Sequence, residues 1–229
     1  MNERPEQHEG HERQPEHGQP EAGSGQEREP DIEAERQEAH EALARDGPRI
    51  YVASLIDYNN GLLHGRWIEA VDDPEAMQEE IEEMLTASPT TARYGGVAEE
   101  WAIHDYDGFG DLRLNEYQAL STIARLAGGI RQHGLAFAAW AAHIGDGGRS
   151  EDAIEQFEDC YRGEWDSVEA YAAELLDQFE LDRIVQQVPE WLRPYVSIDT
   201  GGFARDLEIG GDIVSAETPE GGVWVWSGR

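Results

Sequence analysis

The stretch IYVASLIDYNNGLLHGRWIEA, residues 50–70, decides the fold of this chain. Its two ends are rich in β-branched and aromatic side chains, which favour strands, and Asn60-Gly61 between them is a strong turn signal. Residues 99–106, EEWAIHDY, have the same strand character. The sequence therefore predicts three strands in the first part of the chain.

A helix is predicted between the second and third of these strands. Asp73 is placed to cap it, and Pro74 suits its first turn. The apolar residues that recur at helical spacing share one face: Met77, Ile81, Met84 and Leu85. Together with the strands, this helix makes up a predicted N-terminal α/β domain at residues 48–110.

Helical patterns fill residues 111–160, which we expect to form a central helical domain. Asn115 is expected to cap the first helix of this domain. Residues 135–144 are apolar nearly all round, which predicts a buried helix. Ser150 is expected to cap a third helix, in which Tyr161 faces inward.

The last part of the chain, residues 161–229, predicts a C-terminal α/β domain. A helix is expected to begin at Asp166-Ser167, a short strand at 195–198 and a short helix at 203–208. Two strands follow in the segments DIVSA and GGVWVWSG. The fold class is therefore α+β, with a three-stranded α/β module, a helical bundle and a C-terminal α/β module.

The strand GGVWVWSG, residues 221–228, has a distinct pattern. Its valines alternate with Trp224 and Trp226, which predicts a half-exposed edge or interface strand. Trp224, Val225 and Trp226 are therefore the predicted contact between two copies of the chain. The tryptophans outside this strand are expected to pack in the core or between domains: Trp67, Trp101, Trp140, Trp165 and Trp191.

The first 47 residues differ from the rest. They are rich in Glu, Gln, His, Pro and Gly, and their only large aliphatic side chains are Ile32 and Leu43. Such a segment buries too little apolar surface to offset its chain entropy, so residues 1–47 are predicted to be a disordered acidic tail. Residues 31–45 have the composition of a transient helix.

The charge of the chain is extreme. It holds 49 Asp and Glu against 17 cations, all of them arginine, for a formal net charge of −32 at pH 7. Residues 48–229 hold 35 acids and 12 arginines, so an acidic tail alone does not account for the excess. A charge of this size favours a basic partner such as a DNA-binding groove, although a generically acidic soluble protein has the same composition.

Missing residue types exclude several functions. Without lysine there is no P-loop lysine, Schiff-base lysine or Ser-x-x-Lys pair. The single Cys160 allows no internal disulfide, and its acidic neighbours favour a structural thiol over a nucleophile. The first residues lack a signal-peptide pattern, and the longest apolar run, residues 135–142, is too short to span a bilayer. We therefore expect a soluble cytoplasmic protein with no membrane partner.

No constellation indicates catalysis, a cofactor or a metal. The segment from Asp105 to Glu116 is close to a calcium loop, but Phe109 supplies no oxygen at its fifth position. The histidines lack metal-binding spacing, and carboxylate pairs are too common here to mark an acid–base site. The prediction is no catalytic, cofactor-binding or metal residue.

Rows of carboxylates on helices are more informative. Acidic side chains three or four residues apart on a helix lie about 5–6 Å apart, which is comparable to the spacing of DNA phosphates along a strand. We name as the acidic surface the following residues, which are the candidates for a phosphate-like array: Asp72, Glu75, Glu79, Glu80, Glu83, Asp107, Asp111, Glu151, Asp152, Glu155, Glu158, Asp159, Glu169, Glu174 and Asp177.

Four segments carry a family resemblance. They are the stretch quoted above, AEEWAIHDYDGFG at 98–110, FEDCYRGEWDSVEAYAAELL at 157–176, and FARDLEIGGDIVSAE at 203–217, followed by GGVWVW. In this order they resemble the ArdA antirestriction family of mobile genetic elements, over residues 48–229. The first 47 residues have no counterpart in that resemblance.

The resemblance implies an elongated homodimer of three small domains, joined mainly through the C-terminal domain. It implies a mimic of bent B-form DNA that occupies the DNA groove of type I restriction-modification enzymes, where acidic side chains replace phosphates. It also implies no catalysis, no cofactor and no nucleic-acid partner. Two alternatives stay open: an enzyme with an acidic pocket, and an acidic decoy or chaperone for another basic DNA-binding protein.

Overall fold

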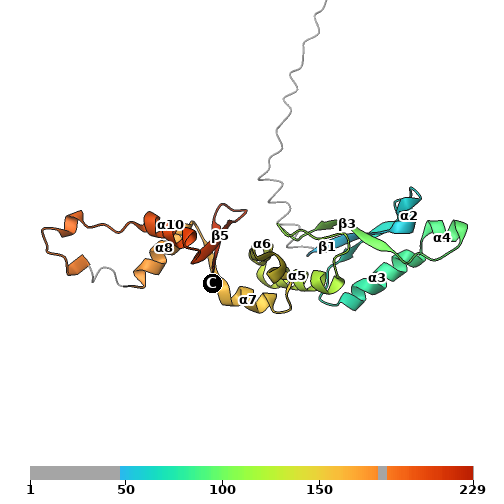
Figure 1. The fold of residues 1–229 in the computed structure, drawn as a ribbon, viewed down its shortest axis with the longest axis horizontal. Coiled ribbons are helices and arrows are strands. Elements are labelled where there is room, and N and C mark those ends of the chain that lie inside the picture. The colour runs from blue at the N-terminus through green and yellow to red at the C-terminus, as the bar shows by residue number, and fades with distance from the viewer. Residues whose placement is uncertain (1–46, 180–184, 229) are drawn as a thin grey trace, which may run out of the picture. The chain divides into compact units, whose positions relative to one another are not determined.

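The computed structural model describes residues 47–179 and 185–228. The predicted acidic tail and its transient helix lie outside the described residues, apart from Gly47. The described part is α+β, as predicted, with two three-stranded antiparallel sheets that are separated in the sequence by helices (Figure 1).

The first sheet has the strand order β2-β1-β3. It comprises β1 (Arg49–Ser54), β2 (Gly65–Glu69) and β3 (Trp101–Asp107). Ile50 of the central strand pairs with Ile68 on one side and Tyr106 on the other, and it is fully buried. The three predicted strands are confirmed, although the residues after β1 form a short helix, α2 (Leu55–Asn59), where a loop was expected.

Helix α3 (Pro74–Thr86) covers this sheet and lies against β1 and β2 (Figure 1). A carboxylate oxygen of Asp73 accepts hydrogen bonds from the backbone N–H of Glu75 (2.9 Å) and Ala76 (3.4 Å), so the predicted cap is confirmed. The predicted apolar face is the buried one: Met77, Ile81, Met84 and Leu85. A further short helix that the sequence did not predict, α4 (Pro89–Tyr94), begins after a cap by Ser88.

The middle of the chain is helical, as predicted. It comprises α5 (Leu120–His133), α6 (Leu135–Ile144), the 3-10 turn η1 (Gly145–Arg149) and α7 (Ala153–Cys160). Two predicted caps are wrong, because α5 begins five residues after Asn115 and α7 has Asp152 at its N-cap position instead of Ser150. The apolar helix α6 is buried from Ala136 to Ala141.

Gly129 lies inside α5, where glycine ordinarily costs helix stability. The reason is contact with α6: a Cβ atom at this position would lie 2.4 Å from the ring of the fully buried Phe137. The two helices therefore approach each other more closely here than any side chain at position 129 allows.

We predict that Gly129→Ala destabilises the fold by about 1–3 kcal/mol, because the methyl group overpacks the α5–α6 contact. Its neighbour Gly128 is the matched control, since a Cβ there would meet only the carboxylate of Asp72 on the surface. Gly128→Ala should leave stability unchanged or raise it. Urea unfolding of both variants measures the difference, and equal midpoints would contradict the close packing.

The second sheet has the order β4-β6-β5 and is built from β4 (Tyr161–Trp165), β5 (Ile213–Glu217) and β6 (Val223–Ser227). Two predictions fail here. Tyr161 begins a strand instead of continuing the preceding helix, and the expected strand at 195–198 is absent, because the 3-10 turn η2 (Arg193–Tyr195) is followed by unpaired chain.

Helices α8 (Val168–Asp177) and α10 (Thr200–Ile209) accompany this sheet and contact each other. The Ser167 hydroxyl accepts a hydrogen bond from the backbone N–H of Ala170, so this predicted helix start is confirmed. The strands predicted from DIVSA and GGVWVWSG are confirmed as β5 and β6.

The predicted half-exposed edge strand is wrong. β6 is the central strand of its sheet, and Trp224, Val225 and Trp226 are 8%, 0% and 1% exposed. Both edges of β6 are paired within one chain, because β4, some 60 residues earlier, supplies a second neighbour beside β5; there the Trp224 indole N–H donates to Glu164. The dimer contact at these residues stays a prediction, without the exposed edge on which it was based.

The tryptophans outside β6 divide into two groups. Trp140 is buried as predicted, and Trp101 and Trp165 are half-buried. Trp67 is 41% exposed, with Arg49 above its ring, and Trp191 is 74% exposed, so core packing is the wrong prediction for Trp191.

One cluster of buried apolar residues extends from Ile50 in β1 to Trp226 in β6. The described residues all belong to one compact unit. The boundaries at 110/111 and 160/161 therefore stay a prediction.

Candidate acidic interaction surface

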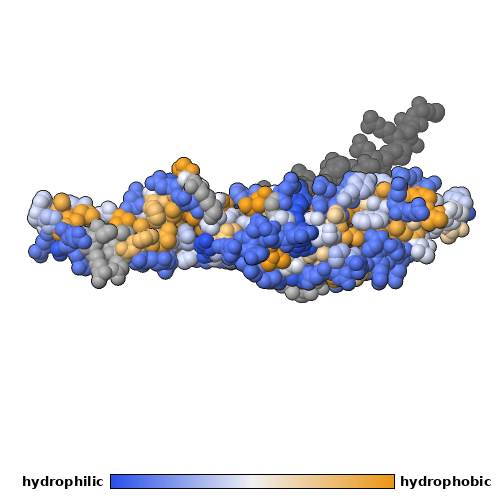
Figure 2. All heavy atoms as spheres, turned by 60° about the horizontal axis from the view of Figure 1, so that its bottom comes forward, coloured by the Kyte–Doolittle hydropathy of each residue, from blue (hydrophilic) through white to orange (hydrophobic). Residues whose placement is uncertain are grey.

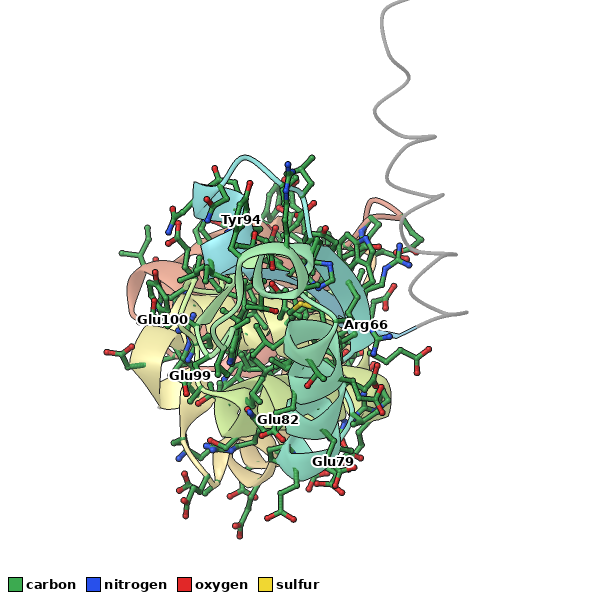
Figure 3. All side chains as sticks on the ribbon, turned by 90° about the vertical axis from the view of Figure 1, so that its right-hand side faces the viewer. Arg66, Glu79, Glu82, Tyr94, Glu99 and Glu100 are labelled. Atoms are coloured by element: carbon green, nitrogen blue, oxygen red, sulfur yellow. The ribbon has the colours of Figure 1, made fainter. Side chains whose placement is uncertain are left out.

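Every residue of the predicted acidic surface is exposed. Helix periodicity explains this for α3, because burying one apolar face turns Glu75, Glu79, Glu80 and Glu83 to the outside. Figure 3 shows Glu79 and Glu82 projecting from this helix. Glu82 was not among the predicted residues, although the same periodicity places it on the outer face.

Helices α7 and α8 follow the same rule. Burial of Ala153 and Phe157 leaves the carboxylates of α7 and the residues before it exposed, and burial of Ala172 does the same for α8. Their exposed acidic residues are Glu151, Asp152, Glu155, Glu158, Asp159, Glu169, Glu174 and Asp177. The displayed face of the molecule is accordingly hydrophilic over most of its area, with apolar patches between (Figure 2).

Arginine neutralises part of this surface, and a histidine lies beside one of its carboxylates. Arg66 lies 3.9 Å from Glu80 and 3.4 Å from Glu83, and Arg49 lies 3.0 Å from Asp107. Asp72 pairs with Arg131, and the His133 ring nitrogen lies 3.1 Å from Glu158. Ion pairs of this exposed kind contribute about 0–1 kcal/mol to stability, so their main effect is on the local charge.

The other members of the acidic surface form no ion pair with any residue that the structure describes. They are Glu75, Glu79, Asp111, Glu151, Asp152, Glu155, Asp159, Glu169, Glu174 and Asp177. We call these the unpaired carboxylates. Because no cation among the described residues compensates them, they contribute most to attraction of a basic partner.

Among residues 47–179 and 185–228, Asp57 is the only carboxylate that is not exposed. Its oxygens accept hydrogen bonds from the Ser54 hydroxyl (2.6 Å) and from the Thr90 backbone N–H (2.9 Å), which joins α2 to α4. Burial alone would raise the pKa of Asp57, but these hydrogen bonds outweigh it and hold the pKa well below its usual range. Its role is structural, since it is closed off from solvent.

We predict that Asp57→Asn destabilises the fold at pH 7 by about 1–3 kcal/mol, because a buried network loses an acceptor. A carboxyl pKa that is lowered by folding stabilises the folded protein at pH values above the ordinary carboxyl pKa of about 4. This stabilisation declines as the pH falls below that value. The stability gap between wild type and variant should therefore narrow from pH 5 to pH 2.5 in urea unfolding. A gap that stays constant over this range would contradict the lowered pKa.

The structure offers no metal centre in the described residues, where no group of three or more potential ligands converges. In the segment that is close to a calcium loop, Asp107 is paired with Arg49, and Phe109 is buried. No helix among the described residues is long and apolar enough to cross a bilayer.

Comparison with known families assigns the chain. The family model described as antirestriction protein (ArdA) matches residues 50–220, which include the first sheet from Ile50 onward, the helices from α2 to α10 and strands β4 and β5, but not β6. The chain belongs to the ArdA antirestriction family. A comparison with curated proteins found no match.

Membership of the ArdA family implies an antirestriction function and an interaction with restriction enzymes. ArdA proteins are inhibitors. A surface of dispersed carboxylates agrees with this role better than a single reactive centre would. The matched residues include the whole acidic surface described above.

Proposed function

We propose that this ArdA protein inhibits type I restriction-modification enzymes by occupying their DNA-binding groove as a DNA mimic. One observation carries the proposal: the described carboxylates, Asp57 apart, are all exposed, and they occur along the chain both before and after α5 and α6, which carry none. Such a distribution supports binding through many weak contacts.

The binding would use the electrostatics of DNA itself. A DNA groove neutralises phosphates with arginine and lysine, and release of condensed counterions makes that binding salt-dependent. Carboxylates three or four residues apart on α3 and α7, such as Glu75 and Glu79 or Glu155 and Asp159, offer anionic groups about 5–6 Å apart. The unpaired carboxylates would supply most of the attraction.

We predict that inhibition declines in steps as unpaired carboxylates are replaced by glutamine. Replacing a single pair, on α3 (Glu75, Glu79), on and just before α7 (Glu155, Glu151) or on α8 (Glu169, Glu174), should weaken inhibition by about two- to fivefold, and replacing all three pairs should weaken it by far more. The measurement is DNA cleavage by a purified type I enzyme, titrated with inhibitor at several salt concentrations. The salt dependence should weaken with each pair removed.

The matched control is the charge-neutral double variant Arg66→Gln/Glu83→Gln, which removes one exposed ion pair and leaves the net charge unchanged. Its inhibition should equal that of the wild type. Complete loss of inhibition from one carboxylate pair would contradict the mimic and indicate a localised site. Equally tight binding to an unrelated basic nucleoid protein would favour the acidic decoy.

We further propose that the chain acts as a homodimer joined through its C-terminal part. Several large apolar side chains of this part are exposed in the single chain: Phe179, Trp191, Tyr195, Ile198 and Ile209. Exposed apolar residues of this kind are typical of interaction sites. The buried Trp224, Val225 and Trp226 are better placed to hold the sheet together than to meet a second copy.

We predict that Ile209→Glu and Trp191→Glu give folded protein with weakened self-association, because both side chains are exposed in the single chain. Trp224→Asp should instead unfold the C-terminal sheet, since it puts a charge into a buried position. Sedimentation equilibrium and circular dichroism distinguish the two results. A folded, monomeric Trp224→Asp variant would restore β6 as the interface.

A further inference from the structure

Two adjoining hollows of about 620 and 610 Å³ lie beside β3, and both are lined by Leu55 and Tyr117. We call them together the β3 groove. Each has a volume within the range of ligand pockets, roughly 300–1,000 Å³. The acidic surface as predicted from the sequence includes none of the residues that line this groove.

Aromatic rings form much of the first hollow. Tyr58 and His104 meet edge to face with ring centroids 4.8 Å apart, and Tyr106 and Tyr117 also line it. Tyr58 and Tyr117 are 52% and 70% exposed, so their rings are available to a ligand. Exposed tyrosine rings that line one hollow favour a flat or cationic group, because the face of the ring is negative.

The groove is also anionic. Glu116 lines the first hollow, and Glu99 and Glu100 line the second. None of these carboxylates has an ion pair with a residue that the structure describes, and no arginine is among the residues that line either hollow. Figure 3 shows Glu99 and Glu100 on the opposite side of the view from Arg66.

The edge of β3 is already occupied at its middle. The Ile103 backbone N–H donates to the carbonyl oxygen of Glu116 at 2.8 Å, so the segment after β3 covers the strand at this point. A partner therefore does not extend the sheet along this edge as a new strand. The groove accepts a side chain instead.

We propose that the β3 groove receives an arginine side chain from a surface segment of the restriction enzyme. This inference rests on the proposed function for the identity of the partner. A guanidinium group is planar, stacks on aromatic rings and pairs with carboxylates through two parallel hydrogen bonds. The tyrosine rings and the glutamates of the groove offer both kinds of contact, whereas the acidic surface on α3 offers charge alone.

The test uses the whole chain and a defined probe, the peptide acetyl-Val-Arg-Val-Arg-Val-amide, in calorimetric titrations at 150 mM salt. Two twin peptides carry lysine or citrulline in place of arginine. The arginine peptide should bind at least about fivefold more tightly than the lysine peptide, since lysine lacks the planar fork, and citrulline should bind weakest because it has no charge. Equal affinities for arginine and lysine would overturn the proposal.

Matched variants locate the binding site. Tyr117→Ala and Glu99→Gln/Glu116→Gln should each weaken binding of the arginine peptide by about tenfold. The controls are Tyr94→Ala, an equally exposed tyrosine outside the groove, and Glu169→Gln/Glu174→Gln on α8; both should change binding by less than about twofold. Equal losses of affinity for the arginine peptide in the groove and control variants would refute the groove as its binding site.

Inhibition of a type I enzyme by the same variants separates this inference from the proposed function. Weaker inhibition by the groove variants than by the controls supports both. If the groove variants inhibit as strongly as the wild type, the proposed arginine site is refuted, but the proposed DNA mimicry is not. Specific binding of the arginine peptide by a protein that inhibits no type I enzyme would refute the proposed function and the assignment of the arginine to that enzyme.

Discussion

Repulsion among carboxylates is the constraint on which this structure depends. Residues 48–229 carry 35 acids and 12 arginines, and the fold must bury a core while keeping these acids apart and hydrated. It does so with helices such as α3, α7 and α8, which bury one face and turn their carboxylates to water, and with α5 and α6, which carry no carboxylate. The exception, Asp57, is tolerated because hydrogen bonds from Ser54 and Thr90 replace its hydration.

Several of the few arginines lie where they connect separate segments of the fold. The Arg131 guanidinium on α5 donates to the Ala70 carbonyl and pairs with Asp72, which connects the helix to the chain after β2. Arg149 donates to the Arg113 carbonyl (2.7 Å), and Arg125 donates to the Arg149 carbonyl (2.7 Å). Because these arginines serve the fold, few of them offset the charge of α7 and α8.

Local signals predicted much of this fold, and long-range pairing accounts for what they missed. Helix α3 was predictable because Asp73, Pro74 and the apolar face lie within one short window. The central position of β6 in its sheet was not predictable from the sequence. Its neighbour β4 lies some 60 residues earlier, where the sequence pattern indicates the end of a helix. Exposure of the acidic surface followed from helix periodicity, but the β3 groove assembles from α2, β3 and residues 114–120, and no single window contains it.

A dispersed acidic surface explains affinity more readily than selectivity. Carboxylates at phosphate-like spacing attract any basic groove, and such attraction falls with salt for every partner alike. Selectivity needs contacts that a wrong partner leaves unsatisfied or cannot make. Tyrosine rings beside carboxylates provide contacts of this kind, since a guanidinium can stack and pair there at once while a diffuse cationic surface cannot. The proposed complex thus combines a long-range field that any DNA-binding groove senses with a local site that a suitably placed arginine fills.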